Sequence, residues 1–353
     1  MTKVGIVTIE SMNYGNRLQN YALQEILKTM NCNVSTFHRG EKPSLKISIK
    51  RRLKTFLQRT VRTKGGLFSE FDKKIRWDKR YISADNAPAN IENEYDFFVT
   101  GSDQVWNPYY DFVGQADLLY FAKPEQRISY AASFGVTKIP EGKKNLYTQN
   151  LNKFSGISVR EQEGLEIVTE LSDKFAELVL DPTLLLDMDE WRKLEKRPRI
   201  DLLQNYILVY ALGQKNDIFN KTIERLKREG QTIFDVRMVG QNGREVAVGP
   251  SEFLYLIDHA DYVLTDSFHA TAFSLIFHKK VKTFNREGID MSSRITSLAN
   301  SINLSRNIDK DGTFCVEQQV DFFEIDKSLN KRRVQSRKFL ENNIKNVGRG
   351  RTE

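Results

Sequence analysis

Short apolar runs and longer amphipathic stretches alternate along most of this chain, and each such pair predicts a β-strand followed by an α-helix. The first pair is an apolar run over residues 4–9, a polar loop over 11–16 and a helical pattern over 17–30. A charged stretch over 187–204 interrupts the alternation, which then resumes. The pattern predicts further strands at 34–37, 96–100, 127–134, 156–159, 178–180, 206–211, 233–239, 262–264 and 281–284.

Two rounds of alternation separated by a charged connector predict an α/β protein with two Rossmann-like domains facing a cleft. The 353 residues suffice for two domains of ordinary size. We place the N-terminal domain at 1–187, with a basic helical insertion at about 42–80, and the C-terminal domain at 188–325. A basic helix over 326–353 completes the division.

The stretch over residues 261–277 carries the clearest functional signal. A β-prone run precedes Thr265, Asp266 and Ser267, whose oxygens suit helix capping, and a nearly apolar helix follows. His269 is therefore predicted in the first turn of a buried helix, at the carboxyl end of a strand. Open parallel sheets hold ligands at that edge, because the exposed N–H groups of a helix N-terminus attract anions. A core histidine that satisfies a neighbour's hydrogen bond is the alternative.

Polar residues also follow the strands predicted in the N-terminal domain. Gly101 comes directly after a strand, where glycine permits a sharp turn or a close approach to a ligand. Arg160 ends another strand, and its planar guanidinium matches a carboxylate or a phosphate; Arg294 is a second such candidate, with surface salt bridges as the alternative for both. The predicted substrate-binding residues are Asn13, Tyr14, Gly15, Asn16, Gly101, Ser102, Gln104, Glu161, Ser267, Phe268, Ala270, Thr271 and Arg294.

Charge adds a localised basic surface to this picture. The net charge is +8, but residues 42–80 hold 14 Lys or Arg against 3 Asp or Glu, so the rest of the chain is about neutral to slightly acidic. This argues against nucleic acid as a partner and indicates a local anionic surface. Residues 45–64 combine apolar positions at helical spacing with basic ones, which predicts either contact with an anionic membrane or a solvated helix packed on its domain.

Composition otherwise fits a soluble globular protein, with 40% hydrophobic and 28% charged residues. No apolar run reaches the roughly 18 residues that a membrane span needs, and the N-terminus has no apolar signal segment. Cys32 and Cys315 are too far apart to indicate a zinc site or a disulfide framework, and the four histidines lack ligand spacing, so we expect no metal. We expect a cytoplasmic protein, held at the inner face of the cell membrane if residues 45–64 bind it.

Several motifs occur in a fixed order along the chain: NYGNRLQNYALQ, GSDQVWNP, SYAASFG, ISVREQEG, DPTLLL and TDSFHATAFSLIF. In this order and spacing they resemble the polysaccharide pyruvyl transferase family, over about residues 4–301. The resemblance implies a fold similar to that of the two-domain GT-B glycosyltransferases, with a donor-binding C-terminal domain, a site in the cleft and a last helix that crosses back to the first domain. It also implies transfer of the pyruvyl group of phosphoenolpyruvate, without a cofactor, to a free or lipid-linked saccharide of a surface-polysaccharide precursor, as a ketal.

Family members use an arginine and a histidine near the donor, and these resemble Arg160 and His269. Many members carry a basic residue two positions before the histidine, in the pattern RLHG, where this chain has Ser267 and, after the histidine, Ala270 in place of glycine. The departure leaves the donor open. We predict that His269 protonates the enol methylene and that Asp103 orients or deprotonates the acceptor hydroxyls, with a helix cap as the alternative for Asp103.

Two other functions fit the sequence. A GT-B-type glycosyltransferase that uses a nucleotide sugar would share the cleft and the need for cations, and selective binding of a nucleoside diphosphate would distinguish it. A non-catalytic binding protein would work through the basic segment, so its activity would depend on Lys50, Arg51 and Arg52 rather than on His269.

Overall fold

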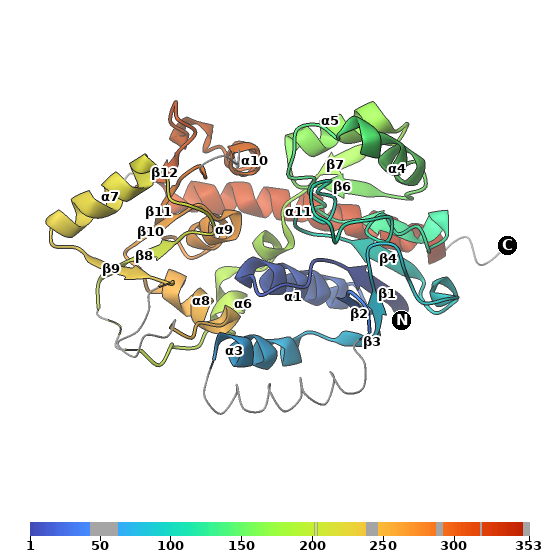
Figure 1. The fold of residues 1–353 in the computed structure, drawn as a ribbon, viewed down its shortest axis with the longest axis horizontal. Helices are drawn as coiled ribbons and strands as arrows, with labels where there is room; N and C mark the ends of the chain where they lie inside the picture. The colour runs from blue at the N-terminus through green and yellow to red at the C-terminus, as the bar shows by residue number, and fades with distance from the viewer. Residues whose placement is uncertain are drawn as a thin grey trace. The chain divides into compact units, whose positions relative to one another are not determined.

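The computed structural model describes residues 1–42, 63–200, 202, 204–237, 246–286, 292–317 and 320–348. The chain divides into two compact units, each with its own sheet (Figure 1). The division after Leu185 lies close to the boundary placed at 187, but α3 (Lys64–Phe71) is grouped with the second unit. Unit 1 comprises Met1–Arg52, Asp72–Leu185 and Lys331–Glu353, and unit 2 comprises Leu53–Phe71 and Leu186–Asn330.

Unit 1 is built on a five-stranded parallel sheet in the order β3-β2-β1-β4-β5. The central strand β1 buries Val4, Ile6 and Val7 completely, as expected for a strand covered on both faces. A parallel pair, β6-β7, continues beyond β5 through isolated bridges. The strands are β1 (Thr2–Val7), β2 (Cys32–Arg39), β3 (Trp77–Ile82), β4 (Phe97–Thr100), β5 (Arg127–Ser129), β6 (Ile157–Val159) and β7 (Ala176–Leu178).

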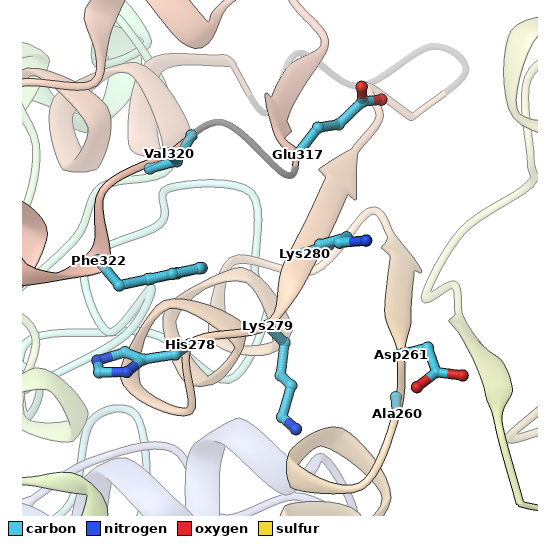
Figure 2. Close-up of a pocket in the computed structure, with 8 residues that line it drawn as sticks. All are labelled: Ala260, Asp261, His278, Lys279, Lys280, Glu317, Val320 and Phe322. Carbon is cyan, nitrogen blue, oxygen red and sulfur yellow. The ribbon is translucent and has the colours of Figure 1, made fainter.

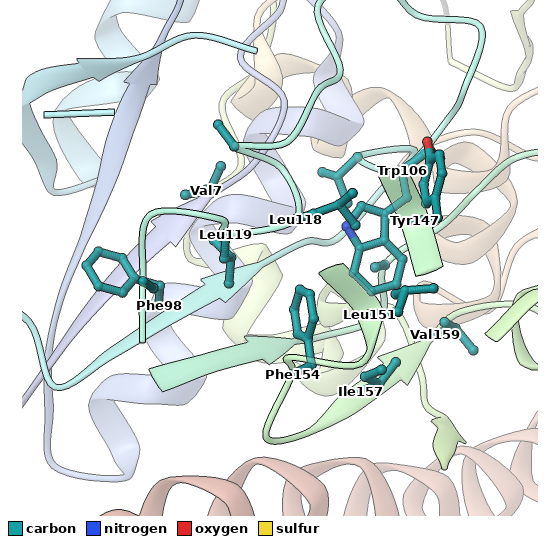
Figure 3. Packing of buried hydrophobic residues seen from close by; sticks show 14 of the residues in the cluster. Val7, Phe98, Trp106, Leu118, Leu119, Tyr147, Leu151, Phe154, Ile157 and Val159 are labelled. Carbon is teal, nitrogen blue, oxygen red and sulfur yellow. Dashed lines mark hydrogen bonds between the residues drawn. The ribbon is translucent and has the colours of Figure 1, made fainter. Parts of the chain in front are cut away.

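Large aromatic side chains fill the core of unit 1 (Figure 3). The fully buried Trp106 packs against Phe134 and Phe154, with ring centroids 5.1 and 5.5 Å apart. This packing anchors the GSDQVWNP segment just beyond its turn. The helices of unit 1 are α1 (Tyr14–Thr29), α4 (Glu141–Leu151), α5 (Gln162–Leu171) and the part of α11 (Phe322–Gly348) from Lys331 onward.

Unit 2 has a second five-stranded sheet in the order β12-β11-β10-β8-β9, in which only the pairing of β12 with β11 is antiparallel among the described strands. The rings of Phe219 and Phe284 stack at 4.2 Å within its core. Its strands are β8 (Tyr206–Tyr210), β9 (Thr232–Asp235), β10 (Tyr262–Thr265), β11 (Lys280–Thr283) and β12 (Phe314–Val316). Besides α3, its helices are α6 (Met188–Arg192), α7 (Asp217–Arg228), α8 (Pro250–Asp258), α9 (Phe268–Ile276), α10 (Ser292–Ser301) and the first part of α11.

Several predicted bounds differ from the structure. Helix α1 begins three residues before the predicted start at 17, because the Asn13 side chain accepts the N–H of Gly15 and caps it. Helix α8 follows Gly249 and begins at Pro250, a residue that suits the first helical turn. The predicted strand over 127–134 ends at Ser129. The basic amphipathic helix predicted at 45–64 lies almost entirely outside the described residues.

Candidate active site

The turn after β4 shows why glycine and serine follow that strand. Gly101 has φ of +117°, and a Cβ there would overlap the carbonyl oxygen of Tyr130, so the position requires glycine. Ser102 is fully buried, and its hydroxyl donates to Asp181 Oδ2 at 2.7 Å. Its backbone N–H donates to Gln19 Oε1 at 3.0 Å. Ser102, predicted to bind substrate, therefore uses its polar groups inside unit 1 and fixes the position of Asp103.

Arg160 lies at the end of β6 in a cluster of carboxylates. Its Nη1 donates to Asp181 Oδ2 at 2.9 Å and its Nη2 to Asp103 Oδ1 at 3.3 Å, while Nε lies 3.8 Å from Glu161 Oε2. Burial alone would lower the pKa of Arg160, but these three acids raise it above its ordinary value, so the guanidinium stays charged. One cation thus faces three carboxylates, and the side chain of Arg160 is only 2% exposed.

The start of α1 reaches the same cluster. Asn16 Nδ2 donates to Asp103 Oδ2, and Ser11 Oγ donates to Asn16 Oδ1. Asn16 was predicted to end a polar loop and to bind substrate, but it lies in the first turn of the helix with its side chain turned to Asp103. Tyr14 and Gly15 are buried in the same turn. The structure therefore brings Asn16, Asp103 and Arg160 together, although they are far apart in sequence.

Gln104 and its neighbours continue this edge of unit 1. Its side-chain oxygen accepts hydrogen bonds from Tyr110 Oη and, at 3.3 Å, from Asn107 Nδ2. Glu161 Oε1 accepts the backbone N–H of Phe134 at 3.1 Å. Gln104 and Glu161, both predicted to bind substrate, hold the loops around Asp103 in place.

Unit 2 presents the predicted strand, turn and helix around His269. Ser267 caps α9, its hydroxyl accepting the N–H of Ala270 at 3.4 Å, and His269 lies in the first helical turn with 6% of its surface exposed. The Phe268 ring stands perpendicular to the imidazole at 5.3 Å. Thr271 bonds Thr283 of the neighbouring strand and the carbonyl of Ser267. The predicted cap and the position of His269 are confirmed.

Asp266, directly before the cap, organises a set of residues that the sequence did not single out. Its carboxylate accepts the N–H groups of Leu212 and Gly213 at 2.7 and 2.8 Å, and Arg286 Nε at 3.0 Å. Arg286 Nη2 also donates to the Asp266 carbonyl at 3.3 Å, whereas Nη1 has no partner within the part of the chain that the structure describes. Within the described ranges, one donor edge of Arg286 is therefore unused beside the start of α9. Arg294, the arginine that was predicted, is 93% buried in α10, three residues into the helix.

A second group at the carboxyl edge of unit 1 was also missed. His38, near the end of β2, places Nδ1 3.3 Å from Glu10 Oε2, and its ring stacks on Trp77 at 4.8 Å and Tyr81 at 5.0 Å. Glu10 belongs to the loop after β1, 28 residues earlier. In the sequence, the only local indication of this group was a histidine at the end of a predicted strand, followed by arginine and glycine.

The opposite end of the unit 2 sheet holds a pocket of about 470 Å³ (Figure 2). His278 stacks on Phe322 at 4.9 Å, with Nε2 3.0 Å from Asp326 Oδ2. Two lysines in the lining are matched by two acids, so the pocket has no charge excess for an anionic donor. It is lined by Ala260, Asp261, His278, Lys279, Lys280, Glu317, Val320 and Phe322.

Glu195, Asp258 and His259 are the one group of potential metal ligands found among the described residues. Arg192 donates to both carboxylate oxygens of Asp258, at 2.7 and 3.1 Å, and Lys279 lies 3.8 Å from it. These cations already occupy the carboxylate that a metal would need. No helix in the described ranges is both long and apolar enough to cross a bilayer.

Comparison with solved structures supports the architecture. UDP-GlcNAc 2-epimerase from Methanocaldococcus jannaschii is 10% identical, with 93% of this chain and 92% of that chain covered and a TM-score of 0.51. UGT89C1 from Arabidopsis thaliana is 11% identical over 98% of this chain and 99% of that chain, with a TM-score of 0.49. Anabaena HepE is 9% identical over 98% and 100%, with a TM-score of 0.47. The predicted fold class, an α/β protein with two Rossmann-like units similar to the GT-B fold, is confirmed.

Sequence comparison places the chain more narrowly. No curated protein sequence is significantly similar to it. The family model described as polysaccharide pyruvyl transferase matches residues 13–286, which include Asp103, Arg160 and His269. The chain therefore belongs to the polysaccharide pyruvyl transferase family.

Proposed function

We propose that this protein transfers the pyruvyl group of phosphoenolpyruvate to a saccharide of a surface-polysaccharide precursor and forms a cyclic ketal. The family match over residues 13–286 carries this proposal. A buried histidine at the start of α9 and a charged arginine at the end of β6 are the chemical groups that support it. The proposed reaction needs no cofactor, because phosphoenolpyruvate supplies both the carbon unit and the leaving group.

In the proposed reaction the donor carbon C3 gains a proton and C2 becomes electrophilic. One acceptor hydroxyl loses its proton and bonds to C2, phosphate leaves with a proton, and a second hydroxyl bonds to C2 with loss of its proton. Two hydroxyl protons are released and two are consumed, one at C3 and one at phosphate, so the reaction balances. His269 is the proposed acid for C3.

The roles of the arginines follow from their surroundings. Arg160 already faces the carboxylates of Asp103, Asp181 and Glu161, and a donor anion would have to compete with them for its guanidinium. We therefore assign Arg160 to holding Asp103 and assign the donor anion to Arg286, whose Nη1 is directed to no described acceptor. N–H groups at the start of α9 would add partial positive charge.

A nucleotide sugar is the alternative donor, since the M. jannaschii structure of similar fold is an epimerase of UDP-GlcNAc. Thermal unfolding of the wild type and of Arg286→Ala, with phosphoenolpyruvate and with a panel of nucleotide sugars, tests the choice. A ligand at a hundredfold excess over Kd stabilises the folded state by about 2.7 kcal/mol. We expect phosphoenolpyruvate to stabilise the wild type and Arg286→Ala to lose the effect; stabilisation by a nucleotide sugar alone would contradict pyruvyl transfer. Arg237→Ala, an exposed arginine bonded to the Leu212 carbonyl, is the matched control.

A further inference from the structure

Two large aromatic side chains are exposed on the loop over residues 106–117, which follows β4. Tyr109 is 70% exposed and Phe112 is 49% exposed. A single exposed ring is ordinary on a protein surface, but two rings on one short loop leave apolar area in water that a ligand can cover. The whole loop belongs to unit 1.

Two consecutive β-turns give both rings the same position in the backbone. Tyr110 donates its N–H to the carbonyl of Asn107 at 3.3 Å, and Val113 donates its N–H to the carbonyl of Tyr110 at 3.1 Å. Tyr109 and Phe112 are the third residues of these two turns. The corners of turns lie furthest from the packed chain, so the same backbone pattern directs both side chains to solvent.

Buried side chains hold this loop in place. Trp106 Nε1, at its start, donates to the carbonyl of Asp117, at its end, at 3.0 Å. Arg39, the last residue of β2, donates from Nη2 to the carbonyl of Phe112 at 3.0 Å and to Asp117 Oδ2 at 2.8 Å. The loop therefore lies at the carboxyl edge of the unit 1 sheet, the edge at which parallel sheets hold ligands. Because the loop is already ordered, a ligand that binds it loses little affinity to the ordering of the chain.

The aromatic residues are connected to Asp103 through Gln104. The Tyr110 ring stacks on Phe112, with centroids 5.1 Å apart and an angle of 28° between the planes. Tyr110 Oη donates to Gln104 Oε1, and the backbone N–H of Gln104 donates to Asp103 Oδ1 at 2.9 Å. The Asp103 side chain is 14% exposed. An aromatic surface and a carboxylate thus share one anchored stretch of chain.

The charges around the loop indicate a ligand without net charge. Asp117 is paired with Arg39 at 2.8 Å, and Asp111 is exposed. Lys143 Nζ donates to the carbonyl of Pro108. Two cations and two acids therefore surround the loop, which has no excess of positive charge to bind phosphoenolpyruvate. A pyranose ring has the complementary chemistry, because its C–H groups carry slight positive charge and pack on the negative face of an aromatic ring, while its hydroxyls bond to carboxylate and amide oxygens.

We propose that Tyr109 and Phe112 form an aromatic platform that binds a pyranose ring of the saccharide acceptor, with Asp103 accepting a hydrogen bond from one of its hydroxyls. The inference rests on the proposed function for the identity of the saccharide, and it requires only residues of unit 1. The two aromatic residues act by binding and take no part in proton transfer.

Leucine substitutions separate an aromatic platform from an apolar contact surface, because leucine keeps most of the apolar bulk and removes the aromatic face. Tyr109→Leu and Phe112→Leu change exposed side chains, so both variants should fold. Phe175→Leu is the matched control, since Phe175 is 98% exposed in unit 1 but directly precedes β7, at the amino end of that strand. Tyr109→Phe retains the ring and should behave as the wild type.

Binding is measured without the donor. The probe is the saccharide fraction released from surface-polysaccharide precursors of source cells that lack the gene, and saturation-transfer nuclear magnetic resonance gives its Kd. We expect Tyr109→Leu and Phe112→Leu each to raise Kd by about 3–10-fold, with Tyr109→Phe and Phe175→Leu unchanged. Absence of binding to the wild type, or an unchanged Kd in both leucine variants, would overturn the inference. Leucine variants that changed only the association state would mark the loop as a contact between copies and would also overturn it.

Transfer of label from phosphoenolpyruvate to the same saccharide separates this inference from the proposed function. The leucine variants should raise the KM for the saccharide and leave the KM for phosphoenolpyruvate unchanged. If the wild type incorporates label and the saccharide KM of both variants is unchanged, the aromatic platform fails and pyruvyl transfer stands. If the wild type incorporates no label but binds the saccharide through Tyr109 and Phe112, the proposed function fails and the platform remains as a saccharide site.

Discussion

Replacing Arg160 by methionine should destabilise unit 1 strongly, because it leaves buried carboxylates without their cation. The Arg160 side chain is 2% exposed, and those of Asp181 and Glu161 are 0% and 1% exposed. With Asp103, one guanidinium and three carboxylates give a formal charge of −2 in the wild type, which becomes −3 in the variant. Breaking a buried ion pair on one side costs about 3–5 kcal/mol.

For a unit of this size that loss corresponds to a fall in Tm of roughly 6–20 °C. Wild type and variant should both carry Trp191→Phe. This substitution leaves only Trp77 and Trp106, both in unit 1, to report unfolding by fluorescence. Urea unfolding at several pH values then gives the loss in free energy of unfolding. Activity is not needed for this measurement.

The pH dependence of this loss in free energy of unfolding tests whether the buried carboxylates cause it. Loss of the guanidinium favours the protonated form of the buried carboxylates that faced it, so the folded variant should gain stability as pH falls and they take up protons. The difference from wild type should therefore be largest near pH 7 and shrink toward pH 4. Arg127→Met is the control, since Arg127 is 96% buried but donates to the carbonyls of Ala122 and Tyr120. A loss below about 1 kcal/mol, or one that does not change with pH, would refute the reasoning.

Three further predictions concern other parts of the chain. Burial and the neighbouring Asp258 raise the pKa of Glu195 to about 8, so the folded state loses stability as pH rises from about 4.5 to 8. In urea unfolding, Glu195→Gln should flatten this decline of the midpoint with pH, and parallel profiles for variant and wild type would contradict the prediction. Gly101→Ala should lower the free energy of unfolding by at least about 1–3 kcal/mol in thermal melts, because the position has a positive φ and a Cβ would overlap Tyr130. Gly142→Ala in α4, where a Cβ meets no atom within 4 Å, should be neutral or stabilising in the same measurement. Asp266→Ala should lower the free energy of unfolding of unit 2 by about 2–4 kcal/mol in urea, because two backbone N–H groups and Arg286 lose their acceptor. Replacement of the exposed Asp261 by alanine should change it by no more than about 0.5 kcal/mol, and similar losses for both variants would contradict the prediction.

Local interactions explain which features of the site could be predicted. The Ser267 cap and the position of His269 depend on residues within one helical turn, and the β-prone run before them defines the strand. The start of α1 was placed three residues late because Asn13 caps it within a stretch that reads as a polar loop. Several asparagines compete for that role in the sequence, and their identity alone does not rank them.

The side-chain pairs at the carboxyl edge of each sheet could not be predicted from one sequence. Glu10 and His38 are 28 residues apart, and Asp266 and Arg286 are 20 apart, so no spacing rule connects them. They meet because parallel strands bring their carboxyl ends to the same edge. The family motifs gave Arg160 and His269, but only the packed sheet shows that Arg160 is surrounded by acids.

The C-terminal part of α11 has a consequence for synthesis. Arg332, Arg333 and Arg337 donate to the carbonyls of Leu178, Leu184 and Leu185, and Ser336 accepts the N–H of Leu180, 156 residues earlier. During translation the segments that make up most of unit 1 emerge first, yet these groups have no partners until residues 332–337 leave the ribosome. Unit 2, encoded in between, can fold on the nascent chain while unit 1 waits for its closing contacts. A chain truncated after Asn330 should therefore hold a folded unit 2 and a protease-sensitive unit 1.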